Sequence, residues 1–327
     1  MKKCKKRMIV ISTVLILFTI SIGVLFYDDG SLSGFTSNSG EAEYKEIYQE
    51  AMAQMPDPQK EFWLETDFGK VKLYYFSSPN ADSTTPLLLL PGKSASTPMW
   101  EPNLSTLIQE CPVYTLDLLG EPGLSVESRR IETASDQSQW LSQVIAALPE
   151  EKVNVLGLSF GGWSAANLAI HSPDKISSLI LVDPVYVFDS IPLKMILASI
   201  PASVPIIPKK IRETMLSYIS GGAKADDDVL IARLIESGMG NFKSKQPMPQ
   251  LIDEKDLSDL DIPVLAVLAG QSTMHHVERA KQCADKNLTH DLSLAVVFEK
   301  ASHAINGEYP DELAETIFDF IKEIEKE

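Results

Sequence analysis

VNVLGLSFGGWSAA, at residues 153–166, is the stretch that decides how this chain folds. Its first six residues are mostly apolar, which is typical of a buried strand, and the small residues after the turn favour a helix. Residues 157–161 have the form Gly-x-Ser-x-Gly, with a glycine two positions before and two positions after Ser159. Glycine permits the close backbone approach of a sharp strand-to-helix turn. Ser159 is therefore expected at the carboxyl end of a strand and at the N-terminus of a helix.

A serine in this position is suited to nucleophilic catalysis. The backbone N–H groups at a helix N-terminus favour negative charge, so they can stabilise an anion that forms beside the serine. A serine hydroxyl is a weak nucleophile at neutral pH, so this interpretation also requires a base within hydrogen-bond reach. The alternative is an ordinary strand-to-helix turn in which Ser159 only caps the helix.

Apolar segments that read as buried strands alternate with helical segments through most of the chain. Strands that are apolar throughout and alternate with helices indicate a mostly parallel central sheet with helices on both faces. Residues 62–64 and 71–76 are expected to pair as a hairpin around a turn at 67–69. The other expected strands are 87–90, 113–116, 176–182, 262–269 and 294–298, and the expected helices are 41–55, 100–110, 134–148 and 308–326.

Between residues 185 and 260 this alternation stops. The segment holds several prolines and short apolar helical pieces, and its two ends lead back to strands of the core. We interpret it as an inserted helical cap, with a second independent domain as the alternative. The expected division is a leader at 1–27, a linker at 28–40, an α/β core at 41–183 and 261–327, and a cap at 184–260.

The N-terminal segment has the pattern of a membrane anchor. Residues 8–26 contain no charged residue, and five of the seven residues before them are Lys or Arg. A helix of this length spans about 28 Å, close to the hydrocarbon thickness of a bilayer. The basic cluster favours a cytoplasmic N-terminus, so we expect a single-pass protein of the cell membrane with its catalytic domain outside the cytoplasm. A cleaved signal peptide and a secreted protein are the alternative.

The composition argues against several other classes of function. The chain has 327 residues and a formal net charge of −16. Such an acidic surface repels phosphate backbones, so we expect no nucleic-acid partner. Three cysteines give no disulfide framework, although a bond between Cys111 and Cys283 is an alternative to free thiols. There are five histidines, of which His275 and His276 could face the cap, and we expect no metal site.

The order of these features resembles that of the α/β-hydrolase superfamily. The matching parts are a Pro91-Gly92 loop after a strand, the Gly-x-Ser-x-Gly turn, an inserted cap and a histidine after the last strand, across about residues 61–325. The chain is similar to single-domain carboxylesterases that carry a helical cap. The resemblance implies the α/β-hydrolase fold and ester hydrolysis without a metal or an organic cofactor.

The resemblance also implies the other members of a catalytic triad. The base of this superfamily occupies the loop after the last strand, which makes His303 the candidate. The acid usually follows the strand at 262–269, but residues 270–274 are Gly, Gln, Ser, Thr and Met. Some members carry the acid one strand earlier, where Asp183 stands, so Asp183 is expected to orient His303. Alternatively, Asp183 only caps the loop into the cap and Ser272 or water orients His303; Glu278 is a third choice.

Acyl transfer further requires two hydrogen-bond donors for the oxyanion. The backbone N–H of Phe160, directly after the serine, is expected to be one of them. The resemblance places the second donor in the loop after the strand at 87–90, where the family usually has His-Gly. This chain has Pro91-Gly92 there, so a side chain that commonly braces the loop is missing. The expected second donor is the backbone N–H of Lys93.

The expected function is a serine hydrolase that cleaves carboxylic esters with small or apolar acyl groups through an acyl-enzyme. Its expected partners are a small-molecule ester and, through the N-terminal helix, a membrane. The same residues could serve a peptidase, a lactonase or an acyltransferase. A catalytically inactive hydrolase fold that binds a ligand at the cell surface is a further alternative, supported by the missing acid after Gly270 and the altered His-Gly pair.

Overall fold

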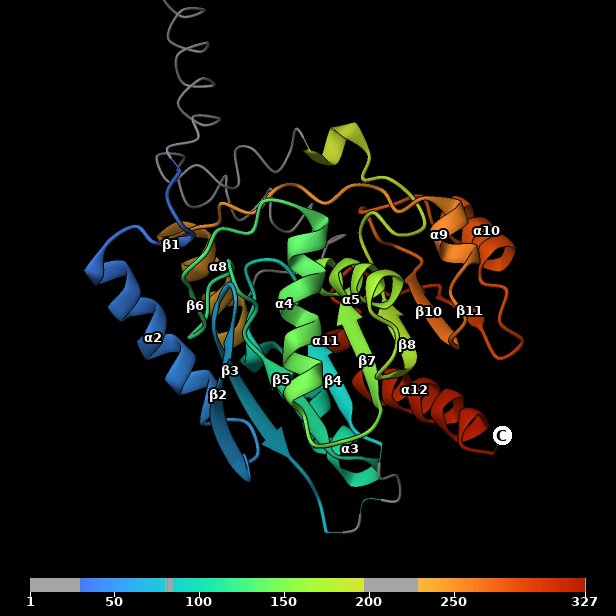
Figure 1. Cartoon of the computed structure of the whole chain (residues 1–327), viewed down its shortest axis with the longest axis horizontal. Coiled ribbons are helices and arrows are strands. Elements are labelled where there is room, and N and C mark those ends of the chain that lie inside the picture. Colours follow the sequence, from blue (N-terminus) through green and yellow to red (C-terminus); the bar gives the residue numbers. More distant parts are fainter. Residues whose placement is uncertain (1–29, 80, 82–84, 197–228, 327) are drawn as a thin grey trace, which may run out of the picture. The chain divides into compact units, whose positions relative to one another are not determined.

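The computed structural model describes residues 30–79, 81, 85–196 and 229–326. The chain divides into two compact units, residues 1–31 and 32–327. The second unit contains all the elements described below, and Figure 1 labels most of them. The expected anchor at residues 8–26 lies outside the described residues. Within the described residues, no helix is both long enough and apolar enough to cross a membrane.

A 9-stranded sheet organises the described part of the second unit, in the order β11-β10-β8-β7-β4-β5-β3-β2, with β6 beside β3. Neighbouring strands from β5 to β11 in this order run parallel, whereas β2, β3 and β6 pair antiparallel. The mostly parallel sheet predicted from the sequence is therefore confirmed. The strands are β2 Lys60–Thr66, β3 Gly69–Phe76, β4 Leu87–Leu90, β5 Val113–Leu116, β6 Val126–Glu127, β7 Val153–Leu158, β8 Ile176–Val182, β10 Val264–Ala269 and β11 Leu294–Phe298.

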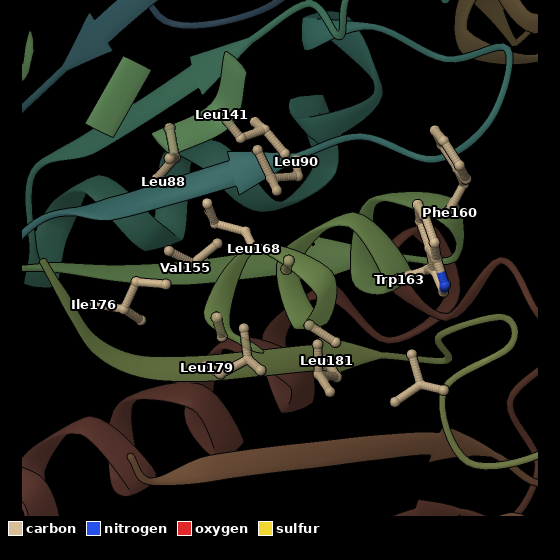
Figure 2. Packing of buried hydrophobic residues seen from close by; sticks show 14 of the residues in the cluster. Leu88, Leu90, Leu141, Val155, Phe160, Trp163, Leu168, Ile176, Leu179 and Leu181 are labelled. Atoms are coloured by element: carbon tan, nitrogen blue, oxygen red, sulfur yellow. The ribbon is translucent and has the colours of Figure 1, made fainter. Parts of the chain in front are cut away.

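Helices cover both faces of this sheet, because alternate side chains of each buried strand point to opposite faces. In β4, Leu88 and Leu90 pack with one group of helices, and Leu87 and Leu89 pack with the other. Figure 2 shows the first layer, in which Leu141 and Leu168 lie against strand residues. The first group is α4 Ala134–Ala147, α5 Phe160–His171 and α10 Val277–Asn287; the second is α2 Asn38–Met52, α3 Glu101–Glu110 and α12 Pro310–Ile324.

The segment predicted to be a linker, residues 28–40, contains regular structure in its second half. Strand β1, Gly34–Phe35, pairs antiparallel with β9, Phe242–Lys243. Helix α2 begins at Asn38, and the Ser37 hydroxyl accepts a hydrogen bond from Gly40 N–H. The Gly/Ser-rich composition that suggested a linker therefore includes a helix N-cap, for which serine is a preferred residue.

The segment predicted to be a cap, residues 184–260, is described in part. It contains α8 Leu230–Asn241, β9 and α9 Glu254–Ser258, while residues 197–228 lie outside the described part. Helix α8 packs against α2, and a Cβ atom on Gly40 would lie 2.6 Å from the Asn241 side chain. Cap residues Val185, Val187 and Phe188 are buried in the main core. The assignment of this segment as a separate cap remains a prediction.

The two cysteines in the described residues are free thiols, so the disulfide considered from the sequence does not form. Cys111 is buried and Cys283 is partly exposed. Burial raises the pKa of the Cys111 thiol to about 12. A thiol that stays protonated at neutral pH is a poor nucleophile, so Cys111 is a packing residue.

Candidate active site

Ser159 lies between the end of β7 and the start of α5, in a conformation that is rare for a residue with a side chain. Its φ is 56° and its ψ is −116°. Such a conformation costs about 1–3 kcal/mol and persists only where the surroundings hold it. Here Ser159 N–H donates to the Val182 carbonyl at 3.0 Å, and the Ser159 carbonyl accepts from Trp163 N–H at 3.1 Å.

The glycines on either side of Ser159 are required by close backbone approach. A Cβ atom on Gly157 would lie 2.2 Å from the Gly161 carbonyl oxygen, and one on Gly161 would lie 2.1 Å from the Leu90 carbonyl oxygen. Neither position could hold another residue without moving the backbone. The turn is therefore compressed against the end of β4, as the Gly-x-Ser-x-Gly pattern predicted.

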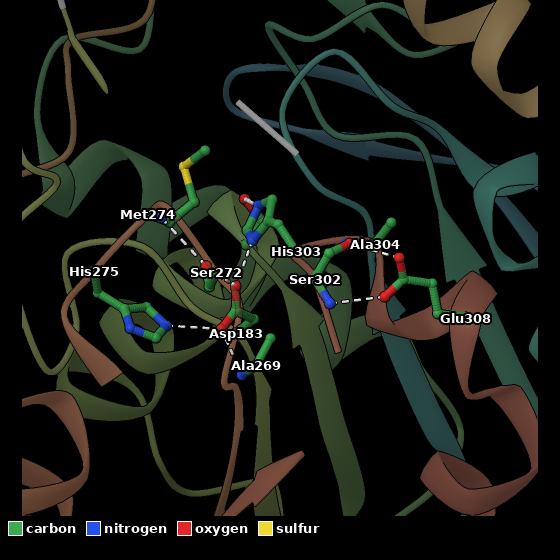
Figure 3. A network of polar contacts seen from close by, with 10 residues as sticks. Asp183, Ala269, Ser272, Met274, His275, Ser302, His303, Ala304 and Glu308 are labelled. Carbon is green, nitrogen blue, oxygen red and sulfur yellow. Dashed lines mark hydrogen bonds and ion pairs between the residues drawn. The ribbon is translucent and has the colours of Figure 1, made fainter. Parts of the chain in front are cut away.

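The structure brings Ser159, His303 and Asp183 together in one chain of hydrogen bonds. The distance from His303 Nε2 to Ser159 Oγ is 2.9 Å, and the distance from His303 Nδ1 to Asp183 Oδ2 is 2.5 Å. Figure 3 shows Asp183 between the imidazole rings of His303 and His275. With Nδ1–H donated to the carboxylate, His303 Nε2 is free to accept the serine proton. The arrangement can therefore activate the Ser159 hydroxyl.

The loop that carries His303 is held by a carboxylate. Glu308, at the end of α11 (Ile305–Glu308), accepts hydrogen bonds from Ser302 N–H at 2.7 Å and from the Ser302 hydroxyl at 2.8 Å. The same hydroxyl oxygen accepts a hydrogen bond from Ala304 N–H at 3.1 Å. The residues on both sides of His303 are thus fixed, which limits the positions that its imidazole can take.

Asp183 follows β8 directly and is fully buried, with a φ of 42°. Its Oδ1 accepts hydrogen bonds from Ala269 N–H at 2.9 Å and from His275 Nε2 at 2.7 Å. Its Oδ2 accepts from the Ser272 hydroxyl at 2.6 Å as well as from His303. Burial alone would raise the pKa of Asp183, but the hydrogen bonds from His275 and His303 outweigh it and lower that pKa below its usual range.

His275 is a site residue that the sequence did not indicate. Its side chain is 1% exposed, and Nε2 contacts Asp183 rather than the cap. Its Nδ1 is buried without a partner among the described residues. An unpartnered Nδ1 favours the tautomer with the proton on Nε2, where it is donated to Asp183. His276 is exposed and contributes its backbone N–H to Asp189, at 2.9 Å.

The loop after β10, which usually supplies the acid in this fold, supplies donors instead. Ser272 and His275 both lie between β10 and α10 and both bind Asp183. Ser272 was considered as the group that orients His303 directly. In the structure its hydroxyl donates to Asp183 instead. Glu278 is exposed, inside α10. The only sequence signal for His275 was its position a few residues beyond a strand end.

We expect His275→Leu to lower kcat by about 10- to 100-fold. A hydrogen bond to a charged group contributes about 1.5–3 kcal/mol, and about 1.4 kcal/mol corresponds to a factor of ten. His275→Gln retains an N–H donor and should recover part of the loss. Steady-state ester hydrolysis measures both variants, with His276→Leu as the matched control. Equal activity of His275→Leu and the parent would show that His275 does not support Asp183.

The two expected oxyanion donors lie on either side of the serine. Phe160 is the first residue of α5, so its N–H has no acceptor within the helix. Across the serine, a Cβ atom on Gly92 would lie 3.5 Å from Ser159 Cβ, which places the loop after β4 beside the nucleophile. Among the described residues, no hydrogen bond to the backbone N–H of Lys93 is found. Both N–H groups are thus available for a ligand.

The Lys93 side chain connects this loop to two other parts of the site. Its Nζ forms an ion pair with Glu121 at 3.0 Å and lies 5.4 Å from the centre of the Phe160 ring. The Phe160 ring in turn stacks on Trp163, with ring centres 5.8 Å apart.

Within the described residues, no group of His, Cys, Asp or Glu side chains is placed to hold a metal ion.

The comparison with known proteins agrees with this fold. A model described as "Alpha/beta hydrolase family" matches residues 87–316, which is more than half of the chain. The chain therefore belongs to the alpha/beta hydrolase family. The family predicted from the Gly-x-Ser-x-Gly turn and the late histidine is confirmed.

The proteins compared next are distant in sequence, and each similarity extends over most of the chain. "Carboxylesterase YbfK" of Bacillus subtilis is 23% identical over 285 residues, covering 85% of this chain and 93% of the relative. The crystal structure of naproxen esterase from Bacillus subtilis has a TM-score of 0.78 at 21% identity, covering 88% of this chain and 100% of that one. A "membrane phospholipase A" has a TM-score of 0.68 at 17% identity, covering 98% and 100%. The structural similarities establish the fold, and the sequence relatives support an esterase-type hydrolase in general.

Proposed function

We propose that this protein is a serine esterase that hydrolyses carboxylic esters through an acyl-enzyme. The single observation that carries the proposal is the hydrogen-bonded chain from Ser159 Oγ through His303 to a buried Asp183. The carboxylesterase relatives support the choice of ester over other acyl compounds. An intact hydrogen-bonded triad also argues against the inactive binding module that the missing acid after Gly270 had suggested.

In the proposed mechanism, His303 Nε2 takes the proton from Ser159 as Oγ attacks the ester carbonyl carbon. The carbonyl oxygen becomes an oxyanion, which the backbone N–H groups of Phe160 and Lys93 bind. Collapse of this intermediate breaks the bond to the alcohol oxygen, and His303 gives that oxygen its proton. Asp183 holds the imidazole in the required tautomer and stabilises its cation during each step.

The acyl-enzyme is then removed by the same residues in a second cycle. His303 takes a proton from water as the water oxygen attacks the acyl carbon. The bond from that carbon to Ser159 Oγ then breaks, His303 returns the proton to Oγ, and the carboxylic acid leaves. We expect the acyl group to be small or apolar, because the segment after Asp183 is apolar (Val185, Val187, Phe188). In the structure these three side chains are buried in the core, so we expect them to act on the acyl site only through the residues that they pack against.

The test is covalent labelling combined with a substrate series. A fluorophosphonate should label the folded protein once, and p-nitrophenyl esters should be hydrolysed with an initial burst that reports acyl-enzyme formation. Parallel assays with an amide, a lactone and added alcohol acceptors separate an esterase from a peptidase, a lactonase or an acyltransferase. A folded protein that neither reacts with the label nor hydrolyses any of these substrates would be the binding module instead.

For localisation we propose an uncleaved N-terminal anchor with the hydrolase unit outside the cytoplasm. The support is the uncharged run at residues 8–26 after a basic cluster. The full chain expressed in bacteria should stay in the membrane fraction after carbonate washing, and external protease should digest it in spheroplasts. A matched chain without residues 1–27 should be soluble. A shortened protein in the medium would favour the secreted alternative.

A further inference from the structure

Glu121, in the connection between β5 and β6, binds two segments that are far from it in the sequence. Its side chain is 1% exposed. Its Oε1 accepts hydrogen bonds from Lys93 Nζ at 3.0 Å and from the Ser244 hydroxyl at 3.0 Å, and its Oε2 accepts from Ser94 N–H at 2.9 Å. One buried carboxylate thus joins the loop after β4 to the segment that follows β9. A buried carboxylate is unfavourable unless it is paired and hydrogen-bonded in this way.

Glu121 contacts both the side chain of Lys93 and the peptide group that follows Lys93. The ion pair fixes the Lys93 side chain, and the hydrogen bond to Ser94 N–H fixes the next peptide group. Ser94 has a φ of 59°, in the left-handed region that is unfavourable for a residue other than glycine. Such a conformation requires support from its surroundings, and Glu121 supplies it. These contacts restrain the peptide group that follows Lys93 and so limit the orientations that the Lys93 backbone can take.

The chain needs this support because position 91 is a proline. Proline has no polar side chain that could brace the loop after β4, and it has no N–H of its own. Besides Glu121, the loop is held by Gly92, whose N–H lies 3.2 Å from Met99 Sδ and whose carbonyl accepts from Ala95 N–H at 3.2 Å. Further along the loop, the Ser96 hydroxyl lies 2.8 Å from the Tyr44 hydroxyl. Sulfur is a weak acceptor, so the carboxylate is the strongest polar contact of this loop.

The second segment is also packed closely against the Glu121 loop. Gln246 Nε2 donates to the Leu119 carbonyl at 2.6 Å. Gly120 has a φ of 74°, and a Cβ atom there would lie 2.4 Å from Gln246 Nε2. Residues 244–246 therefore sit on the loop that carries Glu121. A displacement of these residues would remove the Ser244 contact to the same oxygen that binds Lys93.

We propose that Glu121 is a positioning residue that aligns the Lys93 N–H with the oxyanion and couples this alignment to the seating of residues 244–246. The inference rests on the proposed function, because it assigns a donor for the oxyanion of an acyl-transfer reaction. Without Glu121, the Lys93 N–H would be misaligned. It would then bind the oxyanion of the transition state less well, while substrate binding would stay nearly unchanged.

The experiment compares Glu121→Gln and Ser244→Ala with the parent in ester hydrolysis. Glu121→Gln should lower kcat by about 10- to 100-fold, somewhat less than the loss of a whole oxyanion donor, with KM within about twofold. The inhibition constant of a trifluoromethyl ketone, which forms an oxyanion on Ser159, should rise by the same factor as kcat falls. Ser244→Ala, which leaves the carboxylate in place, should show the same pattern at about 2- to 5-fold.

Glu127→Gln is the matched control, because Glu127 is a neighbouring buried carboxyl group in β6 and should leave kcat within about twofold. Unchanged kcat in Glu121→Gln, or equal changes in KM and kcat, would overturn the inference. Thermal melting checks that Glu121→Gln folds; if it does not, unchanged kcat and inhibitor affinity in Ser244→Ala overturn the proposed coupling. A parent protein that hydrolyses no ester would reject the proposed function itself, which is a separate result.

Discussion

Ser159→Ala should lower kcat for ester hydrolysis by about 10⁵- to 10⁶-fold, to the level that binding and the oxyanion donors supply alone. Alanine removes the only atom that can form the acyl-enzyme at this turn, and no other described hydroxyl is hydrogen-bonded to His303 Nε2. The strained backbone at residue 159 is held by Val182 and Trp163, so the variant should fold. Initial rates with a p-nitrophenyl ester and fluorophosphonate labelling both measure the effect.

A second serine of the same helix provides the control. Ser164 is buried in α5, and its hydroxyl oxygen lies 3.3 Å from Gln137 Nε2. Ser164→Ala should therefore keep kcat within a few-fold of the parent and should still react with the label. If Ser159→Ala retained more than about 1% of the activity, a nucleophile other than Ser159 would be responsible.

Asp183→Asn should lower kcat by about 10⁴-fold, the usual cost of losing the triad acid. The carboxylate accepts two hydrogen bonds on each oxygen, whereas asparagine has one oxygen and one NH₂ group. If the oxygen serves Ala269 N–H and His275, the NH₂ group faces His303 Nδ1. That contact favours the tautomer with the proton on Nε2, and Nε2 could then no longer accept a proton from Ser159.

Asp189→Asn is the control for this substitution. Asp189 lies in the segment that follows Asp183. It accepts hydrogen bonds from His276 N–H and from Arg279, and not from the imidazole of His303. Its replacement should change kcat by less than about threefold. Activity of Asp183→Asn within tenfold of the parent would mean that Asp183 is not the acid of the triad.

Asp183→Asn should also change how the free energy of unfolding depends on pH. Hydrogen bonds in the folded state lower the pKa of Asp183 below the ordinary value of about 3.9. Its ionised form therefore stabilises the native state above that value, and this contribution is lost as pH falls through the lower, folded-state pKa. Urea unfolding between about pH 2 and pH 6 should show a shallower loss of stability for Asp183→Asn than for the parent.

Several strands of the sheet could be predicted because they are mostly apolar runs with clear ends. The runs at 87–90, 113–116, 176–182 and 294–298 have the predicted bounds, and each is followed by a proline, a polar or acidic residue. The start of helix α2 was predicted less well than the strand ends, at residue 41 instead of Asn38. Ser37 and Asn38 read as linker composition, since capping residues are also the residues of flexible segments.

The candidate site could be predicted only where backbone position determines the role. Ser159 and Asp183 directly follow strand ends and His303 lies in the loop after β11, so the sheet brings them together once the strands are placed. His275 and Glu121 meet their partners through side chains, across 92 residues to Asp183 and 27 residues to Ser94. No periodicity or motif marks such long-range polar contacts, so sequence patterns could not identify them.

Because Asp183 is the first residue after β8, exchange of the segment at 184–260 between relatives is constrained. Val185 N–H donates to the Ser159 carbonyl, and Asp189 is bound to α10. On the return path, the Gln250 carbonyl accepts from Trp163 Nε1, and Ile252 N–H donates to the Tyr186 carbonyl. A chimaera that changes substrate range should therefore keep residues 183–189 and 244–252, which leaves these four attachments and the Ser244 contact to Glu121 intact.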